Sequence, residues 1–241
     1  PNPRNLDLAA SLKDPLGQLS VRTFRQRSSI PIYVVADMSA SMGFQGCSTK
    51  PELLADFTSA VARSATRMGD RFGFVGCDNR VREDWSLPLR LHKDGAVEWC
   101  DRLRKFEPAA AQSHSALNIA AGQLGRQRAL VFLVSDFHFP AEQLAAVLDS
   151  LGRHDVVPVV LWDSAEYKQL PSWGLALVGD PETGENRLLF MRPELKARFR
   201  ERFAQRQADL VEECLRRGRS PFFLIDRFNS DALTHYFLSG G

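Results

Sequence analysis

The sequence predicts an α/β fold with three layers, in which helices cover both faces of a mostly parallel sheet. Apolar runs of strand length alternate along the chain with longer stretches that have the apolar periodicity of amphipathic helices. Three of these runs, residues 30–36, 128–135 and 156–162, are almost continuously apolar. Such runs are typical of strands that are buried on both faces, as the inner strands of a parallel sheet are.

The first half of the chain predicts the following elements: a strand at 30–36, a helix at 51–68, a strand at 71–77, a short strand with Val81 and Trp85, and helices at 94–106 and 115–124. Pro51 suits the first turn of a helix, and Leu53, Leu54 and Phe57 begin its apolar stripe. The turn at residues 78–79 makes the two strands around it a hairpin. One edge strand of the sheet is therefore expected to be antiparallel.

The second half predicts a similar series: a strand at 128–135, a helix at 140–151, a strand at 156–162, a hairpin from 175–178 and 187–191, a helix at 193–217, a strand at 221–225 and a helix at 230–238. Gly218 is placed to end the long helix. We expect residues 1–29 to be a lead-in segment. Residues 30–241 are expected to form one domain, with the hairpin, the long helix and the last strand and helix as its C-terminal extension.

Composition narrows the classes of function. Of the 241 residues, 44% are hydrophobic and 25% are charged, and the net charge is +2. This balance gives no indication of nucleic-acid binding or of an acidic membrane surface. No apolar run approaches the roughly 20 residues that a helix needs to cross a bilayer, and no signal peptide pattern is present at the start.

The cysteines are scattered along the chain: Cys47, Cys77, Cys100 and Cys214. No C-x-x-C pair occurs among them, which excludes a zinc ribbon and a disulfide-stapled fold. Free thiols suit a reducing compartment, so we expect a cytoplasmic protein. The chain starts at Pro1, which fits either removal of an initiator methionine or a fragment of a longer chain.

Polar side chains at the ends of predicted strands form a candidate metal site. Asp37, Ser39 and Ser41 follow one buried strand, Asp136 follows another, and Ser113 lies in the loop before a predicted helix. In an open parallel sheet, ligands bind outside the carboxyl ends of the strands. Two carboxylates and three hydroxyls are ligands for a hard divalent cation, and Mg²⁺ fits such a set better than Zn²⁺. Mn²⁺ or Ca²⁺ could replace it.

The spacing of the D-x-S-x-S motif supports this prediction. Alternate side chains of an extended turn point the same way, so Asp37, Ser39 and Ser41 are expected to face one ion. Hydroxyl ligands carry no formal charge, so the bound ion would strongly attract a carboxylate from outside. The site is therefore expected to bind a partner.

These motifs resemble a known family. Asp37–Ser41 is similar to the D-x-S-x-S of the metal-ion-dependent adhesion site in von Willebrand A domains. Ser113 stands where that family usually has Thr, and 134–136 resembles its strand-ending S-D element. The resemblance implies a Rossmann-like von Willebrand A fold and a partner's Asp or Glu that completes the metal's coordination.

A second resemblance covers nearly the whole chain. Residues 4–11 and 19–24, the Asp180–Gly184 loop of the hairpin and residues 222–238 resemble the bacterial "domain of unknown function 58" proteins. Those proteins typically accompany MoxR-type AAA+ ATPases. The resemblance implies a non-enzymatic adaptor that uses Mg²⁺ to bind the ATPase or its client, in client remodelling or complex maturation.

Two other functions stay open. A Mg²⁺-dependent phosphohydrolase or nuclease also has clustered aspartates, but the second acidic position of a D-x-D motif is Ser39 here, and no Lys or Glu is placed in these motifs as a general base. A metal-free scaffold with a degraded site is the other, because Ser113 replaces Thr, and Gln112 and His114 flank it where the family usually has Gly and Asp or Asn. No P-loop motif and no G-x-S-x-G motif occur.

Several neighbouring polar residues have simpler interpretations. His114 and His138 flank the site and are expected to be partly exposed loop residues. Asp78 is expected to belong to the hairpin turn, and Asp163 and Asp226 are expected to lie away from the site, because the loops of edge strands point elsewhere. The arginines in residues 192–219 alternate with acidic residues, which favours a solvated helix face over a nucleic-acid site.

Overall fold

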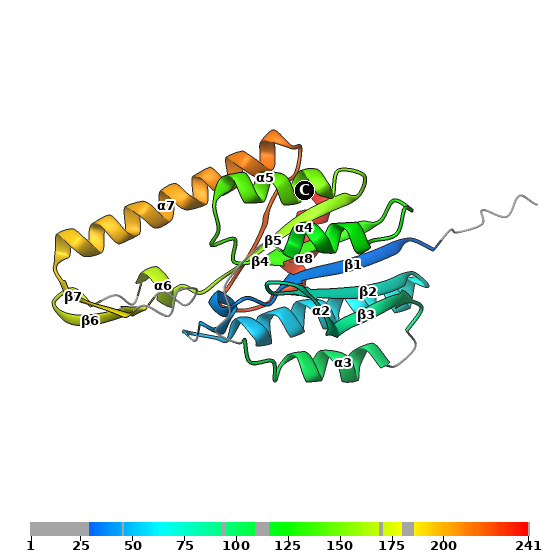
Figure 1. Ribbon diagram of the computed structural model, residues 1–241, viewed down its shortest axis with the longest axis horizontal. Helices are drawn as coiled ribbons and strands as arrows, with labels where there is room; N and C mark the ends of the chain where they lie inside the picture. Colours follow the sequence, from blue (N-terminus) through cyan, green and yellow to red (C-terminus); the bar gives the residue numbers. More distant parts are fainter. Residues whose placement is uncertain are drawn as a thin grey trace, which may run out of the picture.

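The computed structural model describes residues 29–44, 46–92, 95–108, 116–168, 171–179 and 186–240. Its centre is a six-stranded sheet in the order β3-β2-β1-β4-β5-β8 (Figure 1). The strands of this sheet are β1 (Pro31–Asp37), β2 (Arg71–Cys77), β3 (Val81–Arg90), β4 (Leu130–Ser135), β5 (Asp155–Trp162) and β8 (Phe222–Ile225). The helices are η2 (Ala40–Gly43), α2 (Lys50–Met68), α3 (Gly95–Leu103), α4 (Ala116–Gln123), α5 (Ala141–Ser150), α6 (Ala165–Lys168), α7 (Pro193–Arg216) and α8 (Ser230–Leu238).

The sheet is parallel except at one edge. β3 pairs with β2 in the antiparallel direction, and every other neighbouring pair in this sheet is parallel. This confirms the prediction of a mostly parallel sheet with one antiparallel edge strand. The chain passes from β1 outward to β3, and then returns to β4 on the other side of β1. β1 and β4 are therefore neighbours at a topological switch point, where open α/β sheets bind ligands.

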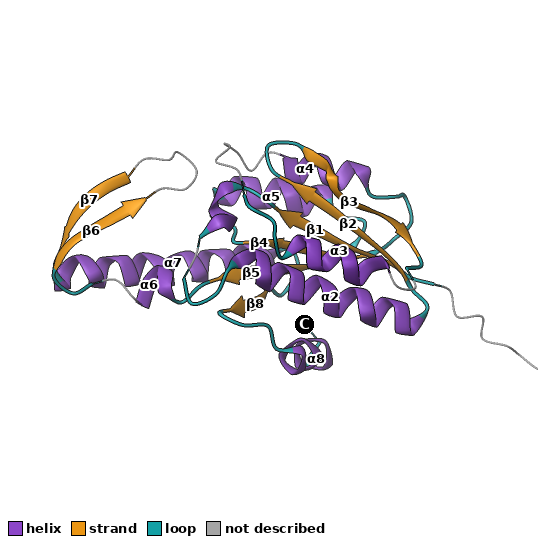
Figure 2. Cartoon of the chain, turned by 90° about the horizontal axis from the view of Figure 1, so that it is seen from below, coloured by secondary structure: helices purple, strands orange, loops and turns teal. Residues whose placement is uncertain are grey.

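Helices cover both faces of the sheet, as the apolar runs predict. Helices α4, α5 and α7 supply Leu117, Leu144 and Leu210 to one apolar cluster. Helices α2 and α3 contribute Phe57 and Leu103 to a second cluster on the opposite face, against which α8 also packs (Figure 2). Neighbouring β1 residues belong to different clusters, so both faces of this strand are buried. The continuous apolar pattern of the inner strands follows from this arrangement.

Helix α2 starts beside the carboxyl ends of the strands and has clear capping signals. The Thr49 hydroxyl accepts a hydrogen bond from the backbone N–H of Glu52 at 3.3 Å, and Pro51 occupies the first turn. Gly69 ends the helix with φ of 75°, a left-handed conformation that favours glycine. These caps fix where the helix begins, and they place Lys50 at the edge of the sheet where the candidate site lies.

The predicted hairpin is confirmed as a separate two-stranded antiparallel sheet of β6 (Gly174–Gly179) and β7 (Asn186–Met191). Together with the first half of α7 it projects from the body of the molecule (Figures 1 and 2). Trp173, Leu175, Leu188 and Phe190 are large apolar side chains that remain exposed on it. The predicted loop at 180–184 and the predicted lead-in segment up to residue 28 lie outside the described residues.

Observed and predicted elements differ at their ends, in two short helices that were not predicted, η2 and α6, and in β3, which has 10 residues where a short strand was expected. Helix α6 has only four residues, and no apolar periodicity in so short a segment predicts it. Helix α3 begins and ends inside the predicted 94–106 range. In the described part of the chain, no helix is both long enough and apolar enough to span a membrane.

Candidate metal centre

The two aspartates of the candidate site lie at the switch point of the sheet. Asp37 is the last residue of β1, and Asp136 directly follows β4. The relative exposure of both residues is low, 2% for Asp37 and 1% for Asp136. The Ser135 hydroxyl joins the two strands, because it donates a hydrogen bond to the Asp37 carboxylate at 2.7 Å. The sequence-based expectation that these strand ends meet is therefore consistent with the geometry.

The two serines of the D-x-S-x-S motif also come together. Their hydroxyl oxygens are 3.1 Å apart, and the backbone N–H of Ser39 donates to Asp37 at 2.9 Å. The expected reason for this convergence is wrong, however. Ser39 has extended backbone angles, but Ser41 lies in the 3₁₀ turn η2, which bends the chain and brings its hydroxyl back toward Ser39.

Lys50 is the main residue of this site that the sequence did not reveal. Its residue exposure is only 1%, and its ammonium lies 2.8 Å from an Asp136 carboxylate oxygen. The same nitrogen lies 2.8 Å from Glu166 and donates to the backbone carbonyl of Ser41 at 3.2 Å. Lys50 therefore links the D-x-S-x-S turn, the end of β4 and helix α6. Of the five predicted ligands, Asp136 and Ser41 contact Lys50, and Asp37 and Ser39 lie next to them. The fifth, Ser113, lies outside the described residues.

The ionisable groups of the site differ in how their charge is compensated. Burial and the negative charge of Asp136 raise the pKa of Asp37 to about 6, although hydrogen bonds from Ser39 and Ser135 oppose this effect. Burial alone would raise the pKa of Asp136, but the Lys50 ammonium outweighs it and the pKa is lowered. Asp136 is thus a paired carboxylate. In the described part of the chain, no ion pair reaches Asp37.

The pKa of Lys50 is raised as well. Burial would lower it, but the charges of Asp136 and Glu166 have the larger effect, so Lys50 stays protonated. When Asp37, Asp136 and Glu166 are all ionised, Lys50 supplies one positive charge beside three carboxylates and pairs directly with Asp136 and Glu166. Two negative charges remain, which equals the charge of one divalent cation. The residues fit such an ion in donor chemistry and in charge, provided that Lys50 moves away from Asp136.

His138 lies beside the network and is partly exposed, as expected, with 31% of its side chain accessible. Its ring nitrogen Nε2 is 3.7 Å from a Glu166 carboxylate oxygen. Burial lowers the pKa of His138 in spite of the nearby charges of Asp136 and Glu166, so the ring is neutral at pH 7. A neutral ring does not repel a cation. His114, the other flanking histidine, lies outside the described residues.

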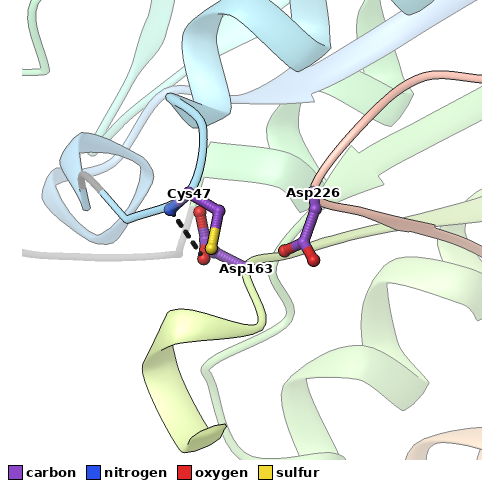
Figure 3. A group of neighbouring side chains, drawn as sticks. All are labelled: Cys47, Asp163 and Asp226. Atoms are coloured by element: carbon purple, nitrogen blue, oxygen red, sulfur yellow. Dashed lines mark hydrogen bonds between the residues drawn. The ribbon is translucent and has the colours of Figure 1, made fainter. Parts of the chain in front are cut away.

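A second acidic group lies next to the site. Figure 3 shows Cys47, Asp163 and Asp226, whose ligand atoms all lie within 4.8 Å of one another. Asp163 accepts backbone hydrogen bonds from Cys47, Ser48 and Ala165 at 2.8–3.1 Å. Although burial alone would raise the pKa of Asp163, these hydrogen bonds outweigh its effect, so the pKa is lowered. The carboxylate therefore fixes the loop that leads into α2.

The position of Asp163 corrects one expectation. It follows β5, which lies between β4 and β8 and is not an edge strand. Its loop therefore points toward the site and contacts the segment that precedes Lys50. Asp226, after the true edge strand β8, accepts a hydrogen bond from the backbone of Ser164 at 2.6 Å. Asp78 has the expected turn role, since it accepts from the backbone N–H of Arg80 at 3.0 Å.

A groove of about 890 Å³ begins at the site and runs between α7 and the loop after β4. His138 and Glu166 are among the residues that line it. Phe139, Phe203 and Arg206 contribute to its walls, so the groove is mainly apolar with charged groups at its border. The site is therefore continuous with a surface that is large enough for a peptide segment.

The model of the family described as "Protein of unknown function DUF58" matches residues 4–212, which is most of the chain. The chain belongs to the DUF58 family. The matched range includes all five predicted ligands as well as Lys50 and Glu166. The resemblance inferred from the sequence is thereby confirmed at the level of the family.

The chain is similar in sequence to two uncharacterized bacterial proteins. An "uncharacterized protein in moxR 3'region" of Paracoccus denitrificans is 39% identical over 101 residues, which cover 42% of this chain and 96% of that protein. The uncharacterized protein Rv1480 of Mycobacterium tuberculosis is 24% identical over 195 residues, or 79% of this chain and 61% of that protein. The chain thus spans less than two thirds of the mycobacterial relative.

Two solved structures resemble this DUF58 chain only distantly. BatB from Bacteroides thetaiotaomicron has 14% identity and a TM-score of 0.48, with 88% of this chain and 98% of that chain covered. An aerotolerance-related membrane protein from Bacteroides fragilis has 11% identity and a TM-score of 0.45 over the same shares. Similarity at this level carries no conclusion about function.

Proposed function

We propose that this protein is a non-enzymatic adaptor with a von Willebrand A-type fold and a metal-ion-dependent adhesion site. Its ligands would be Asp37, Ser39, Ser41, Ser113 and Asp136, and Mg²⁺ would be the ion. The observation that carries the proposal is the pair of buried aspartates at the switch point of the sheet, next to two serine hydroxyls in mutual contact. Such a set of oxygen donors with excess negative charge suits a hard divalent cation.

When bound, the ion would supply an electron-poor centre with a coordination position for a carboxylate from the partner. The protein's own residues prepare this position. Ser135 and the backbone of Ser39 hold the Asp37 carboxylate in place through two hydrogen bonds. The η2 turn presents Ser41 from the same side. The Asp37 carboxylate and the two serine hydroxyls are thus held in place before an ion binds, and the rearrangement that binding requires is the movement of Lys50 away from Asp136.

A MoxR-type AAA+ ATPase, or its client, is the proposed partner. The support is the name of the Paracoccus denitrificans relative, which places that protein beside moxR. The apolar groove between α7 and the loop after β4 gives the partner a surface next to the metal. The adaptor would present a client for remodelling or complex maturation, and a cytoplasmic location is part of the same proposal.

The phosphohydrolase alternative requires a general base in the site. The sequence motifs contain no Lys or Glu that could serve as a base, yet the structure brings Lys50 and Glu166 into the site. Neither is suited to this role. Lys50 is protonated, since the neighbouring carboxylates raise its pKa, and Glu166 is paired with it. A general base must be free to accept a proton, so the adaptor remains the better supported function.

A binding experiment tests the proposal. Purified protein would be immobilised and incubated with a MoxR-type ATPase from the source organism, in Mg²⁺ and again in EDTA. We expect binding in Mg²⁺ that is lost in EDTA and in the double variant Ser39→Ala/Ser41→Ala. Asp155→Asn is the matched control, because Asp155 is an exposed carboxylate at the opposite ends of the strands. Binding that is the same with EDTA would reject the metal-dependent function.

A further inference from the structure

We propose that Lys50 is a tethered cation that occupies Asp136 in the metal-free protein, and that a divalent ion binds by exchange. In this exchange the ammonium would leave Asp136 and keep its contact with Glu166, and the carboxylates of Asp136 and Asp37 would both become available to hold the ion. The proposal rests on the proposed metal site and concerns how that site is regulated.

The contacts of Lys50 show why exchange is possible. Its ammonium lies at 2.8 Å from each of two carboxylates, and these belong to different elements. Asp136 follows β4 and Glu166 is on α6, so the loss of one partner leaves the other in place. A buried ammonium without a counter-ion would be strongly destabilising. Glu166 removes this obstacle, because it can keep the ammonium paired after Asp136 has bound the metal.

The alternative, in which metal and ammonium share Asp136, is unfavourable. Two cations at one buried carboxylate repel each other strongly where water is excluded. The Asp136 oxygen Oδ2 is already in contact with the Lys50 ammonium, and Oδ1 accepts from the backbone N–H of His138 at 3.1 Å. An ion that approaches Asp136 must therefore displace Lys50 or bind more weakly.

The charges of the site determine which ions can drive the exchange. With Lys50 on Glu166, the carboxylates of Asp37 and Asp136 leave two negative charges for the incoming ion. One divalent cation neutralises both, whereas a monovalent cation leaves one buried charge uncompensated. The exchange therefore favours Mg²⁺ or Mn²⁺ over K⁺ and Na⁺, without any ligand that is specific for magnesium.

The exchange also connects the metal to the groove. Glu166 lines the groove beside α7, and it lies near the His138 ring. When the ammonium stays on Glu166 alone, the position of this carboxylate responds to the state of the metal. The surface proposed for the partner thus changes together with the ion.

Removal of Lys50 is the direct test. Lys50→Met keeps most of the length of the side chain and removes its charge. Calorimetric titration with Mg²⁺ and with Mn²⁺ should show binding at least about tenfold tighter than in the wild type, because no ammonium has to be displaced. The thermal midpoint without metal should fall, because Asp136 and Glu166 lose their shared cation. Lys105→Met, at an exposed lysine, is the control and should leave both values unchanged.

Glu166→Gln tests the second half of the exchange. Its effect in the wild-type background does not depend on the folding of Lys50→Met, and an unchanged or higher metal affinity there would already contradict the exchange. In this variant Lys50 has only Asp136 as a carboxylate partner, so metal affinity should fall although Glu166 is no ligand. In the Lys50→Met background the same change should have a smaller effect, since no ammonium needs a new partner. An equal effect in both backgrounds would contradict the exchange. Glu142→Gln, at an exposed glutamate on α5, is the control.

The outcomes separate this proposal from the proposed function. If the wild type binds metal and Lys50→Met binds it equally or more weakly, the exchange is wrong and the metal site stands. If no variant binds Mg²⁺ or Mn²⁺, both the exchange and the metal-dependent adaptor are rejected. If only Lys50→Met binds metal, Lys50 is confirmed as the occupant of the site, and the metal-dependent function of the natural protein is rejected.

Discussion

Replacement of Asp37 by Asn should stabilise the metal-free protein. Burial and the charge of Asp136 raise the pKa of Asp37 from its ordinary 3.8 to about 6, so the ionised form is disfavoured in the folded state. Asn has the same shape and no charge. Its carbonyl oxygen can accept from the backbone N–H of Ser39, and its amide can donate to the Ser135 hydroxyl, so both local contacts are retained.

The size of the effect follows from the pKa. Each pH unit between the folded and unfolded pKa values corresponds to about 1.4 kcal/mol, so ionised Asp37 lowers the free energy of unfolding at pH 7 by about 3 kcal/mol. The sign can be checked from proton binding. Between about pH 4 and pH 6 the folded protein holds more protons on Asp37 than the unfolded chain does, so stability falls as the pH rises through this range.

Urea unfolding in EDTA would measure the difference. At pH 7.5 the variant Asp37→Asn should be more stable than the wild type by about 2–3 kcal/mol, and at pH 4 the two should nearly coincide. Addition of Mg²⁺ should stabilise the wild type and not the variant, because the variant lacks a charged ligand. Glu142→Gln, at an exposed carboxylate on α5, should show none of these effects.

A destabilised Asp37→Asn variant at pH 7.5 would refute this reasoning. It would mean that the negative charge of Asp37 is favourable in the metal-free protein, and that the two hydrogen bonds compensate its burial fully. A stabilisation of the same size at pH 4 and pH 7.5 would also refute it, because the effect would then not depend on the ionisation of Asp37.

Three further predictions concern the surroundings of the site and the fold. Gly46→Ala would place a Cβ only 2.5 Å from an Asp163 carboxylate oxygen, so it should lower the free energy of unfolding by about 1–3 kcal/mol in urea and shift the loop before Lys50. Phe57→Ala removes a fully buried ring under the sheet and should destabilise by about 3–5 kcal/mol in the same assay. Trp173→Ser, at a side chain that is 66% exposed, should change stability by less than about 0.5 kcal/mol.

Much of the fold was predictable because strands that are buried on both faces have continuous apolar sequences. The residues of β1 and β4 are apolar at successive positions, because helices cover each face of the sheet. The turn at Asp78 predicts the antiparallel edge strand. The positions of the residues at the strand ends could be predicted next. Once β1 and β4 are recognised as inner parallel strands, Asp37 and Asp136 must lie at the same edge of the sheet, and only their adjacency remained to be established.

The partners of these aspartates could not be predicted in the same way. Lys50 stands at the start of an amphipathic helix, where a lysine is usually solvated, and Glu166 belongs to a four-residue helix with no periodicity of its own. Their ion pair joins positions far apart in the sequence. A weak signal exists in retrospect: Thr49 and Pro51 fix the start of α2, and a lysine between them must lie where the helix meets the strand ends.

The presence of a lysine in a candidate cation site has a physical explanation that does not require a degraded site. Asp37 and Asp136 are both buried, and two ionised carboxylates in such a place would oppose folding before any metal arrives. An internal ammonium reduces this repulsion, so the chain can fold without the ion. In the proposed exchange the same ammonium would then lower the affinity for metal, because it would have to move before an ion reached Asp136. The contact of Lys50 with a second carboxylate, Glu166, is therefore the feature that would make the proposed metal site reversible.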